Sequence, residues 1–169
     1  MKPSILALFL AAATITASSV CTAQQNAQEN ETTALARISQ ANLYELEAGK
    51  LAVQMADGED IKDLAWKEVR DHELINRELT ALAAAKNIPL ASKLTPELQQ
   101  RLDRIKSASG RDFDNAYLNA MISSHKSEEQ FLANEATSGN ASDLKSFATR
   151  TDAIFKRHIA ALHSDDAKE

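Results

Sequence analysis

One stretch in the second half of the chain carries an apolar stripe with a histidine in its middle. Counted from His125, the residues three, four and seven positions back and seven positions ahead are all apolar: Ile122, Met121, Leu118 and Leu132. These spacings place the side chains on one face of an α-helix. A titratable ring within such a face needs a hydrogen-bond partner, a metal ion or a neutral state. The stripe therefore predicts a buried helix whose histidine has a specific partner.

Three further segments show the same helical periodicity, and turn-forming residues separate them. Gly58, Pro89 and Gly139 mark breaks between the periodic segments. Thr95-Pro96-Glu97 predicts a helix start, because threonine caps a helix, proline suits the first turn and glutamate complements the helix dipole. We expect Asp112 to cap the helix that carries His125. The predicted helices cover residues 32–56, 60–86, 96–107, 112–138 and 141–163.

The few helix breakers and the short connections indicate the fold class. The chain contains only four glycines and three prolines, and no segment has the pattern of a strand. Four long helices with short turns are expected to run antiparallel to their neighbours. We predict an all-α, up-down antiparallel four-helix bundle, with the short helix in the connection between the second and third long helices.

The beginning of the chain is typical of a cleaved export signal. Lys2 gives a positive start, an apolar run continues to Ile15, and Ala23 supplies a small residue for cleavage. The run is about half of the ~20 residues that a membrane span needs. We predict a periplasmic or secreted protein with no transmembrane segment in its mature form. Its predicted parts are a signal peptide (1–23), a flexible segment (24–31), a bundle domain (32–164) and a charged tail (165–169).

The charge and the single cysteine exclude several classes of function. A net charge of −5 argues against nucleic-acid binding. Cys21 lies within the predicted signal, so the cleaved chain has no disulfide and no thiolate ligand. Any metal site would use nitrogen and oxygen ligands.

Each long helix carries, within its apolar stripe, one polar residue that is able to bind a metal. These are Glu45, His72, His125 and His158. Each buried polar group costs about 1–3 kcal/mol when it is unpaired, so we expect the four to meet. Three imidazoles and a carboxylate would suit one transition metal ion, which we interpret as zinc, copper or iron.

The distance of each residue from the nearest turn indicates its level along the bundle, and these levels favour contact among three of the four residues. Glu45 before Gly58 and His72 after it are almost equally distant from that turn, which places them at the same level. His158 lies farther after Gly139 than His125 lies before it. The difference is about five residues, or ~7 Å at ~1.5 Å per residue, so we expect His158 one turn away from the others.

Neighbouring polar residues are interpreted as surface groups. Three acids lie one helical turn from a histidine: Glu68 before His72, and Glu128 and Glu129 after His125. We interpret them as part of a solvated face, although any of them could accept a hydrogen bond from an imidazole N–H. Tyr117 is expected at the edge of the core with its hydroxyl in water. His163 is expected on the surface.

Three functional hypotheses follow from this pattern. The first is an exported metal-binding protein of envelope stress or metal handling. The second is a non-metal envelope interaction module with a structural Glu/His network, whose stability would fall as histidine ionises near pH 6. The third, a hydrolase or oxidoreductase, needs a water-accessible pocket next to His125. No histidine follows a glutamate by three residues, which argues against the di-iron pattern of ferritin-like bundles.

Several of these residues together resemble a known bacterial family. The run Glu45 to Ala52, the pair Asp71-His72, Phe113-Asp114 with Tyr117 and His125, and Phe155 to His158 are similar to domain-of-unknown-function family 4142. The resemblance covers about residues 33–162. It implies a ferritin-like four-helix bundle exported to the envelope of Gram-negative bacteria, with no assigned activity. The matching positions are Glu45, His72, Asp114, Tyr117, His125 and His158; Asp152-Ala153 departs from the pattern, where a leucine-proline pair is expected.

Overall fold

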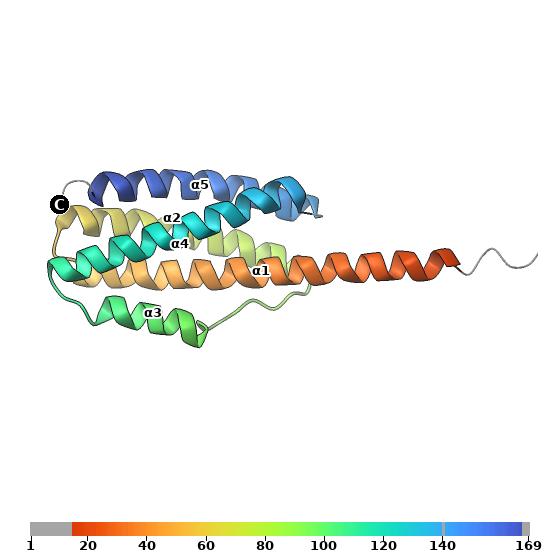
Figure 1. Ribbon diagram of the computed structural model, residues 1–169, viewed down its shortest axis with the longest axis horizontal. Coiled ribbons are helices and arrows are strands. Elements are labelled where there is room, and N and C mark those ends of the chain that lie inside the picture. Colours follow the sequence, from red (N-terminus) through yellow and green to blue (C-terminus); the bar gives the residue numbers. More distant parts are fainter. Residues whose placement is uncertain (1–14, 140, 167–169) are drawn as a thin grey trace, which may run out of the picture.

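The computed structural model describes residues 15–139 and 141–166, with side chains over residues 30–139 and 141–164. Within these residues the protein is all-α, with five helices and no strand. The helices form a bundle (Figure 1). They are α1 (Ile15–Met55), α2 (Glu59–Ala85), α3 (Pro96–Lys106), α4 (Arg111–Ser138) and α5 (Ser142–Asp166). None of the described helices is long and apolar enough to cross a membrane.

Local sequence explains where α2 ends and α3 begins. After α2 the chain turns at Asn87, which adopts a positive φ of 56°, a conformation that asparagine tolerates better than most residues. The hydroxyl of Thr95 accepts a hydrogen bond of 3.3 Å from the backbone N–H of Leu98, and Pro96 occupies the first turn of α3. The predicted start of this helix is confirmed.

The start of α4 differs from the prediction. The N-cap is Gly110, with a φ of 57°, and Asp112 lies within the first turn. Glycine reaches this left-handed conformation without strain, so the chain reverses earlier than a capping aspartate at position 112 would require. Asp112 still contributes negative charge to the helix N-terminus.

The first helix begins earlier than predicted. It starts at Ile15 and includes residues 24–31, for which the sequence analysis expected no regular structure. This segment lacks glycine and proline, so nothing in it ends the helix. Cleavage after Ala23 would fall within α1 and stays a prediction. Residues 1–14 of the predicted signal and 167–169 of the predicted tail lie outside the described residues.

The helix directions correct the predicted strict alternation. In Figure 1, α1 and α2 run antiparallel, as do α4 and α5, but α2 and α4 run in the same direction. Consistently, Ile61 at the start of α2 and Phe113 at the start of α4 belong to one apolar cluster. The reason is that α3 carries the chain back along the bundle. Leu102 and Ile105 anchor α3 in that cluster, against α1 and α4.

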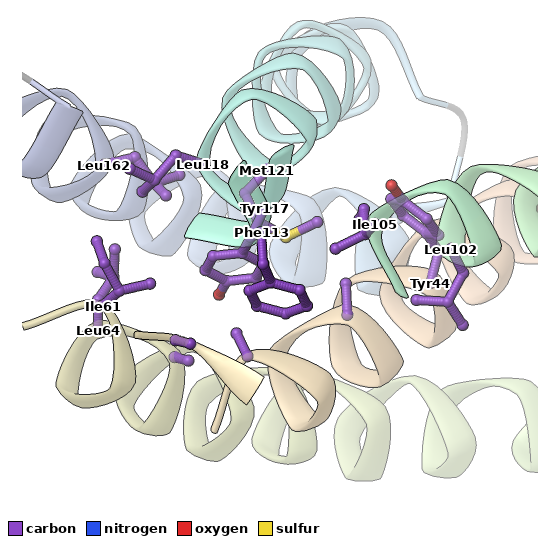
Figure 2. Close-up of a cluster of buried hydrophobic side chains, with 14 residues drawn as sticks. Tyr44, Ile61, Leu64, Leu102, Ile105, Phe113, Tyr117, Leu118, Met121 and Leu162 are labelled. Carbon is purple, nitrogen blue, oxygen red and sulfur yellow. The ribbon is translucent and has the colours of Figure 1, made fainter. Parts of the chain in front are cut away.

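Two apolar clusters form the core. The first lies at the end where α2 and α4 begin and includes Phe113, Tyr117 and Leu162 (Figure 2). The second lies toward the other end and includes Leu35 and Phe147. Leu118, Met121 and Leu132 of the stripe around His125 are buried in these clusters, and Ile122 is partly buried against the first. In α2, α4 and α5 the metal-binding candidates lie between the segments that contribute to the two clusters, and in α1 Glu45 directly follows Tyr44 of the first cluster.

The first two helices approach closely beside these candidates. A Cβ atom at Gly49 would lie 3.0 Å from Val69 Cγ2, so any larger residue would require the valine side chain to shift. Gly49 is one turn after Glu45, and Val69 follows Glu68 directly. The close approach therefore brings these two carboxylates into the same layer of the bundle.

Candidate metal centre

A layer of buried polar side chains crosses the bundle between the two apolar clusters. One ligand atom from each of four residues lies within 4.8 Å of the other three. The residues are Glu68 and His72 of α2, His125 of α4 and His158 of α5. The first three are at most 1% exposed, and His158 is 6% exposed. The layer is therefore almost closed to water.

The carboxylate of Glu68 lies at the centre of this group. Its Oε2 atom is 3.0 Å from His125 Nε2, 3.1 Å from His158 Nδ1 and 3.5 Å from His72 Nε2. The first two nitrogens are themselves 3.1 Å apart. Ligand atoms of a tetrahedral site with metal bonds of about 2.0–2.2 Å are separated by about 3.3–3.6 Å. The cluster therefore has dimensions that could hold a metal ion.

The other nitrogen of each imidazole contacts a hydrogen-bond acceptor. His72 Nδ1 lies 3.0 Å from Asn42 Oδ1. His125 Nδ1 lies 2.9 Å from the carbonyl oxygen of Met121. His158 Nε2 lies 3.1 Å from Asp71 Oδ2. Each outer nitrogen therefore carries the proton and donates it.

This assignment decides what the inner nitrogens present. A neutral imidazole has one protonated nitrogen and one lone pair. With the outer nitrogens protonated, the three inner nitrogens present lone pairs within 3.5 Å of Glu68 Oε2. Among the described residues, both oxygens of Glu68 lack a hydrogen-bond partner. The inner nitrogen of His72, Nε2, also lacks one. Four acceptors without a donor repel one another unless a proton or a metal cation lies between them.

The electrostatics of the cluster favour positive charge at its centre. Burial would raise the pKa of Glu68, but the contacts with His125, His158 and His72 lower it well below its usual 4.5. Burial would lower the pKa of His125, but the charge of Glu45, the close contact with the charged carboxylate of Glu68 and the hydrogen bond to the Met121 carbonyl raise it from 6.5 to about 9. When no metal is bound, His125 therefore holds an additional proton at neutral pH.

Glu45 lies on the outer side of two of the imidazoles. Its Oε2 is 3.7 Å from His72 Nδ1, and its Oε1 is 3.7 Å from His125 Nδ1. Both oxygens are buried and lack a hydrogen-bond partner among the described residues. The structure thus places Glu68, not Glu45, in the convergent group, while Glu45 adds negative charge behind the ligands. A direct metal bond from Glu45 stays a prediction.

His158 lies in the same layer as the other histidines, contrary to the expected offset of one turn. The prediction measured both depths from Gly139. In the structure α4 ends at Ser138 and α5 begins only at Ser142, so the connection is longer than a turn centred on Gly139. Counted from these ends, the depths of His125 and His158 differ by only about three residues, or ~4.5 Å. Side chains bridge this distance, because the two rings lean toward each other with centroids 5.3 Å apart.

Other polar residues of the sequence pattern have structural contacts. The carboxylate of Asp114 accepts hydrogen bonds of 3.0 and 2.9 Å from the backbone N–H groups of Asp57 and Gly58, so it fixes the turn between α1 and α2. Tyr117 is completely buried and its hydroxyl has no described partner, so the expectation of a water-facing hydroxyl is wrong. The hydroxyl is held inside because its ring packs in the first apolar cluster.

The remaining acids and the last histidine divide between core and surface. Glu128 is 7% exposed and pairs at 3.1 Å with Arg37, which corrects its interpretation as a solvated residue. Glu129 is half-buried and lies 3.7 Å from Lys156. His163 is exposed, as predicted.

Sequence reasoning missed the central position of Glu68 and the role of two hydrogen-bond acceptors. The signal for Glu68 was its spacing: it lies one helical turn after Leu64 and one before His72, within the buried stripe. For Asn42, the signal was its position three residues before Glu45 on the same helix face, which is a core position for a polar residue. Asp71 gave no such signal, because only the packing of α5 against α2 brings His158 to it.

The exposure of the cluster bears on the hypothesis of a hydrolase or oxidoreductase. His125 has no exposed surface. Within the described residues, therefore, no water-accessible pocket reaches this ring. The side chains of His158 and its acceptor Asp71 are 7% and 17% exposed.

Comparison with known proteins identifies a family and no function. A family model described as a domain of unknown function, DUF4142, matches residues 16–164 of the chain. This range includes every residue of the polar layer. No curated protein and no solved structure matches the chain. The resemblance expected from the sequence is confirmed.

Proposed function

The chain belongs to the DUF4142 family, a domain of unknown function, and we propose that it binds one transition metal ion within its buried Glu/His cluster. The proposed ligand atoms are Glu68 Oε2, His72 Nε2, His125 Nε2 and His158 Nδ1. Asn42, the Met121 carbonyl and Asp71 orient the imidazoles from outside, as the second set of hydrogen bonds does in many metal sites.

The observation that carries the proposal is the convergence of acceptors. Three imidazole nitrogens with outward-directed protons surround a carboxylate oxygen at 3.0–3.5 Å. Buried polar atoms without partners are rare, because each costs about 1–3 kcal/mol. A bound cation would satisfy His72 Nε2 and Glu68 Oε2 at once.

The charge balance supports a divalent ion. Glu45 and Glu68 are both almost fully buried, and a buried carboxylate needs a compensating positive charge. Three nitrogen ligands and one oxygen ligand suit zinc, copper or iron, and no thiolate takes part. Glu68 precedes His72 by four residues, not three, so the site differs from the paired Glu-x-x-His motifs of di-iron bundles.

The wider proposal is a periplasmic protein of metal handling or envelope stress with a ferritin-like bundle. Its support is the signal-like N-terminus and the single crossover connection through α3, which ferritin-like bundles share. Release of processed protein into the periplasmic fraction would test the location, and retention of the full chain in the cytoplasm would contradict it.

Elemental analysis of untagged protein tests metal binding. After dialysis against buffer without chelator, we expect about one zinc, copper or iron ion per chain. His125→Ala should lose this ion, whereas the matched control His163→Ala, which removes an exposed histidine, should retain it. Metal-free wild-type protein that also fails to take up any of the three ions would refute the proposal.

A second candidate function is a non-metal interaction module, and one observation favours it. The raised pKa of His125, about 9, allows a protonated imidazole to replace a metal as the donor to Glu68. The cluster would then be a structural network within the bundle. Metal-free wild-type protein with a well-folded core, together with His125→Ala that is merely less stable, would select this candidate.

A further inference from the structure

A groove with unpaired positive charge lies outside the polar layer, between α1, α3 and α4. It consists of two adjoining pockets of about 450 and 290 Å³, which share Arg101 and Ser123. Gln40 of α1 lies at the edge of the groove. Its side chain donates a hydrogen bond of 2.9 Å to the Lys93 carbonyl and accepts one of 3.0 Å from the Thr95 N–H. The groove is therefore held by hydrogen bonds between α1 and the segment before α3.

Two of the arginines in this groove lack a carboxylate partner. Arg101 and Arg104 of α3 form no ion pair with a described side chain. Arg37, at the other end, pairs with Glu128 at 3.1 Å and donates to the hydroxyl of Ser127 at 3.3 Å. Arg101 and Arg104 lie three residues apart on α3 and line the same pocket, so both guanidinium groups serve one site. They produce a local positive potential that attracts anions.

The buried residue Tyr44 adds a second, independent observation. Its side chain is 0% exposed, and its hydroxyl makes no well-aligned hydrogen bond with a described residue, although Arg101 lies close enough to lower its pKa. Tyr44 also lines the smaller pocket, and Figure 2 shows its ring beside Leu102 and Ile105 of α3. Burial raises the pKa of Tyr44, so the hydroxyl keeps its proton at neutral pH. An O–H donor therefore lies at the wall of the groove.

The stacking of Arg101 on this ring orients its donors. The guanidinium carbon of Arg101 lies 4.8 Å from the centroid of the Tyr44 ring. A guanidinium group stacked on an aromatic face keeps its N–H groups at the periphery, where they are free to bind a planar or tetrahedral oxyanion. The aromatic ring thus holds the arginine in position before any ligand binds.

We propose that this groove binds the phosphate group of a small molecule. Guanidinium N–H groups from Arg101 and Arg104, the Tyr44 O–H and the serine hydroxyls of α4 offer donors from several directions, which suits the tetrahedral oxygens of a phosphate. The lining serines are Ser123, Ser124 and Ser127. Either a free phosphate ion or a phosphorylated metabolite presents the same group, and the size of the larger pocket leaves room for the remainder of a small organic molecule.

The groove is separate from the polar layer but adjoins it. Ser124 directly precedes His125 along α4, and Glu128 follows one turn later. No residue of the groove is among the proposed metal ligands. The phosphate proposal therefore does not depend on the metal proposal, and chelated protein is suitable for its test.

Titration of the full chain with inorganic phosphate tests the proposal. Amide chemical shifts are followed by NMR at constant pH and ionic strength. Shifts at Ser123, Ser124 and Ser127 that saturate are expected. Arg101→Ala should weaken binding about tenfold or more, because it removes a charge-assisted donor. The matched control Arg157→Ala removes the same charge from an exposed residue of α5 and should bind like wild type.

Two further measurements separate specific binding from general charge effects. Tyr44→Phe keeps the ring under Arg101 and removes only the hydroxyl, so it should weaken binding several-fold without loss of the fold. Succinate at equal ionic strength should bind more weakly than phosphate. Equal binding of phosphate by wild type and both groove variants, or no saturable shifts in α4, would overturn the proposal. Tighter binding of glycerol 3-phosphate than of inorganic phosphate would identify an organic phosphate as the ligand.

Discussion

Raising the pH of the metal-free protein is expected to destabilise it through His125. The imidazole lies between the carboxylates of Glu68, at 3.0 Å, and Glu45, at 3.7 Å. His158 Nδ1 is the other close group, at 3.1 Å. Burial alone would lower the pKa of His125, but the two carboxylates reverse this effect and raise it from 6.5 to about 9. The folded protein therefore binds this proton more tightly than the unfolded chain.

The sign and size of the effect follow from the two pKa values. Below pH 6.5 both states bind the proton, and its full contribution to the free energy of unfolding is present. As the pH rises through 9 the folded state loses the proton and the contribution disappears. A pKa of about 9 against 6.5 corresponds to about 3 kcal/mol. An unperturbed buried histidine would instead destabilise the fold as the pH falls near 6, which was the expectation from sequence.

Urea unfolding followed by circular dichroism measures this contribution. Chelated wild type and His125→Gln are compared at about pH 6 and about pH 10, and the difference between their pH dependences removes the effects of other groups. Wild type should lose about 3 kcal/mol more than the variant. Equal losses in the two proteins, or a wild type that gains stability at high pH, would refute the reasoning.

Three further predictions concern the ligands and the helix ends. Glu68→Gln should lower metal affinity at least 100-fold and Glu45→Gln only about 10-fold, since only Glu68 is expected to contact the ion. Competition with a metal indicator measures both affinities, and the reverse order would assign the ligand role to Glu45. Asp114→Ala should lower the free energy of unfolding by about 3 kcal/mol, because two backbone N–H groups lose a charged acceptor. A decrease of less than about 1 kcal/mol, measured by urea unfolding, would contradict this prediction. Thr95→Ala should cost about 1 kcal/mol by the same assay, through loss of the cap of α3, and should leave metal content unchanged.

Much of the candidate site was predictable, because the periodicity of apolar residues indicates which face of a helix is buried. His72, His125 and His158 each stand where the apolar repeat requires a core residue. Such positions bury a side chain whatever its partner is. The sequence therefore identified three of the four convergent residues without any knowledge of how the helices meet.

The sequence pointed to Glu45, whereas the structure brings Glu68 into the convergent group, for a geometric reason. Glu45 and Glu68 are both almost fully buried, and they lie 3.7 and 3.0 Å from imidazole nitrogens. Periodicity reports which face of a helix is buried, but not which nitrogen of a ring a carboxylate reaches. Only the rotation of the packed helices places Glu68 at the inner nitrogens and Glu45 at the outer ones.

By itself the sequence determined the all-α class, the extent of α2 and α3, and the residues that face the core, because local hydrogen bonding, capping and periodicity fix these features. The tertiary structure alone decided that α4 runs parallel to α2, since α3 spans the bundle in between. It also decided that His158 joins the layer and that Asp71 orients it. Contacts between helices distant in sequence depend on tilt, rotation and side-chain reach, which no single segment encodes.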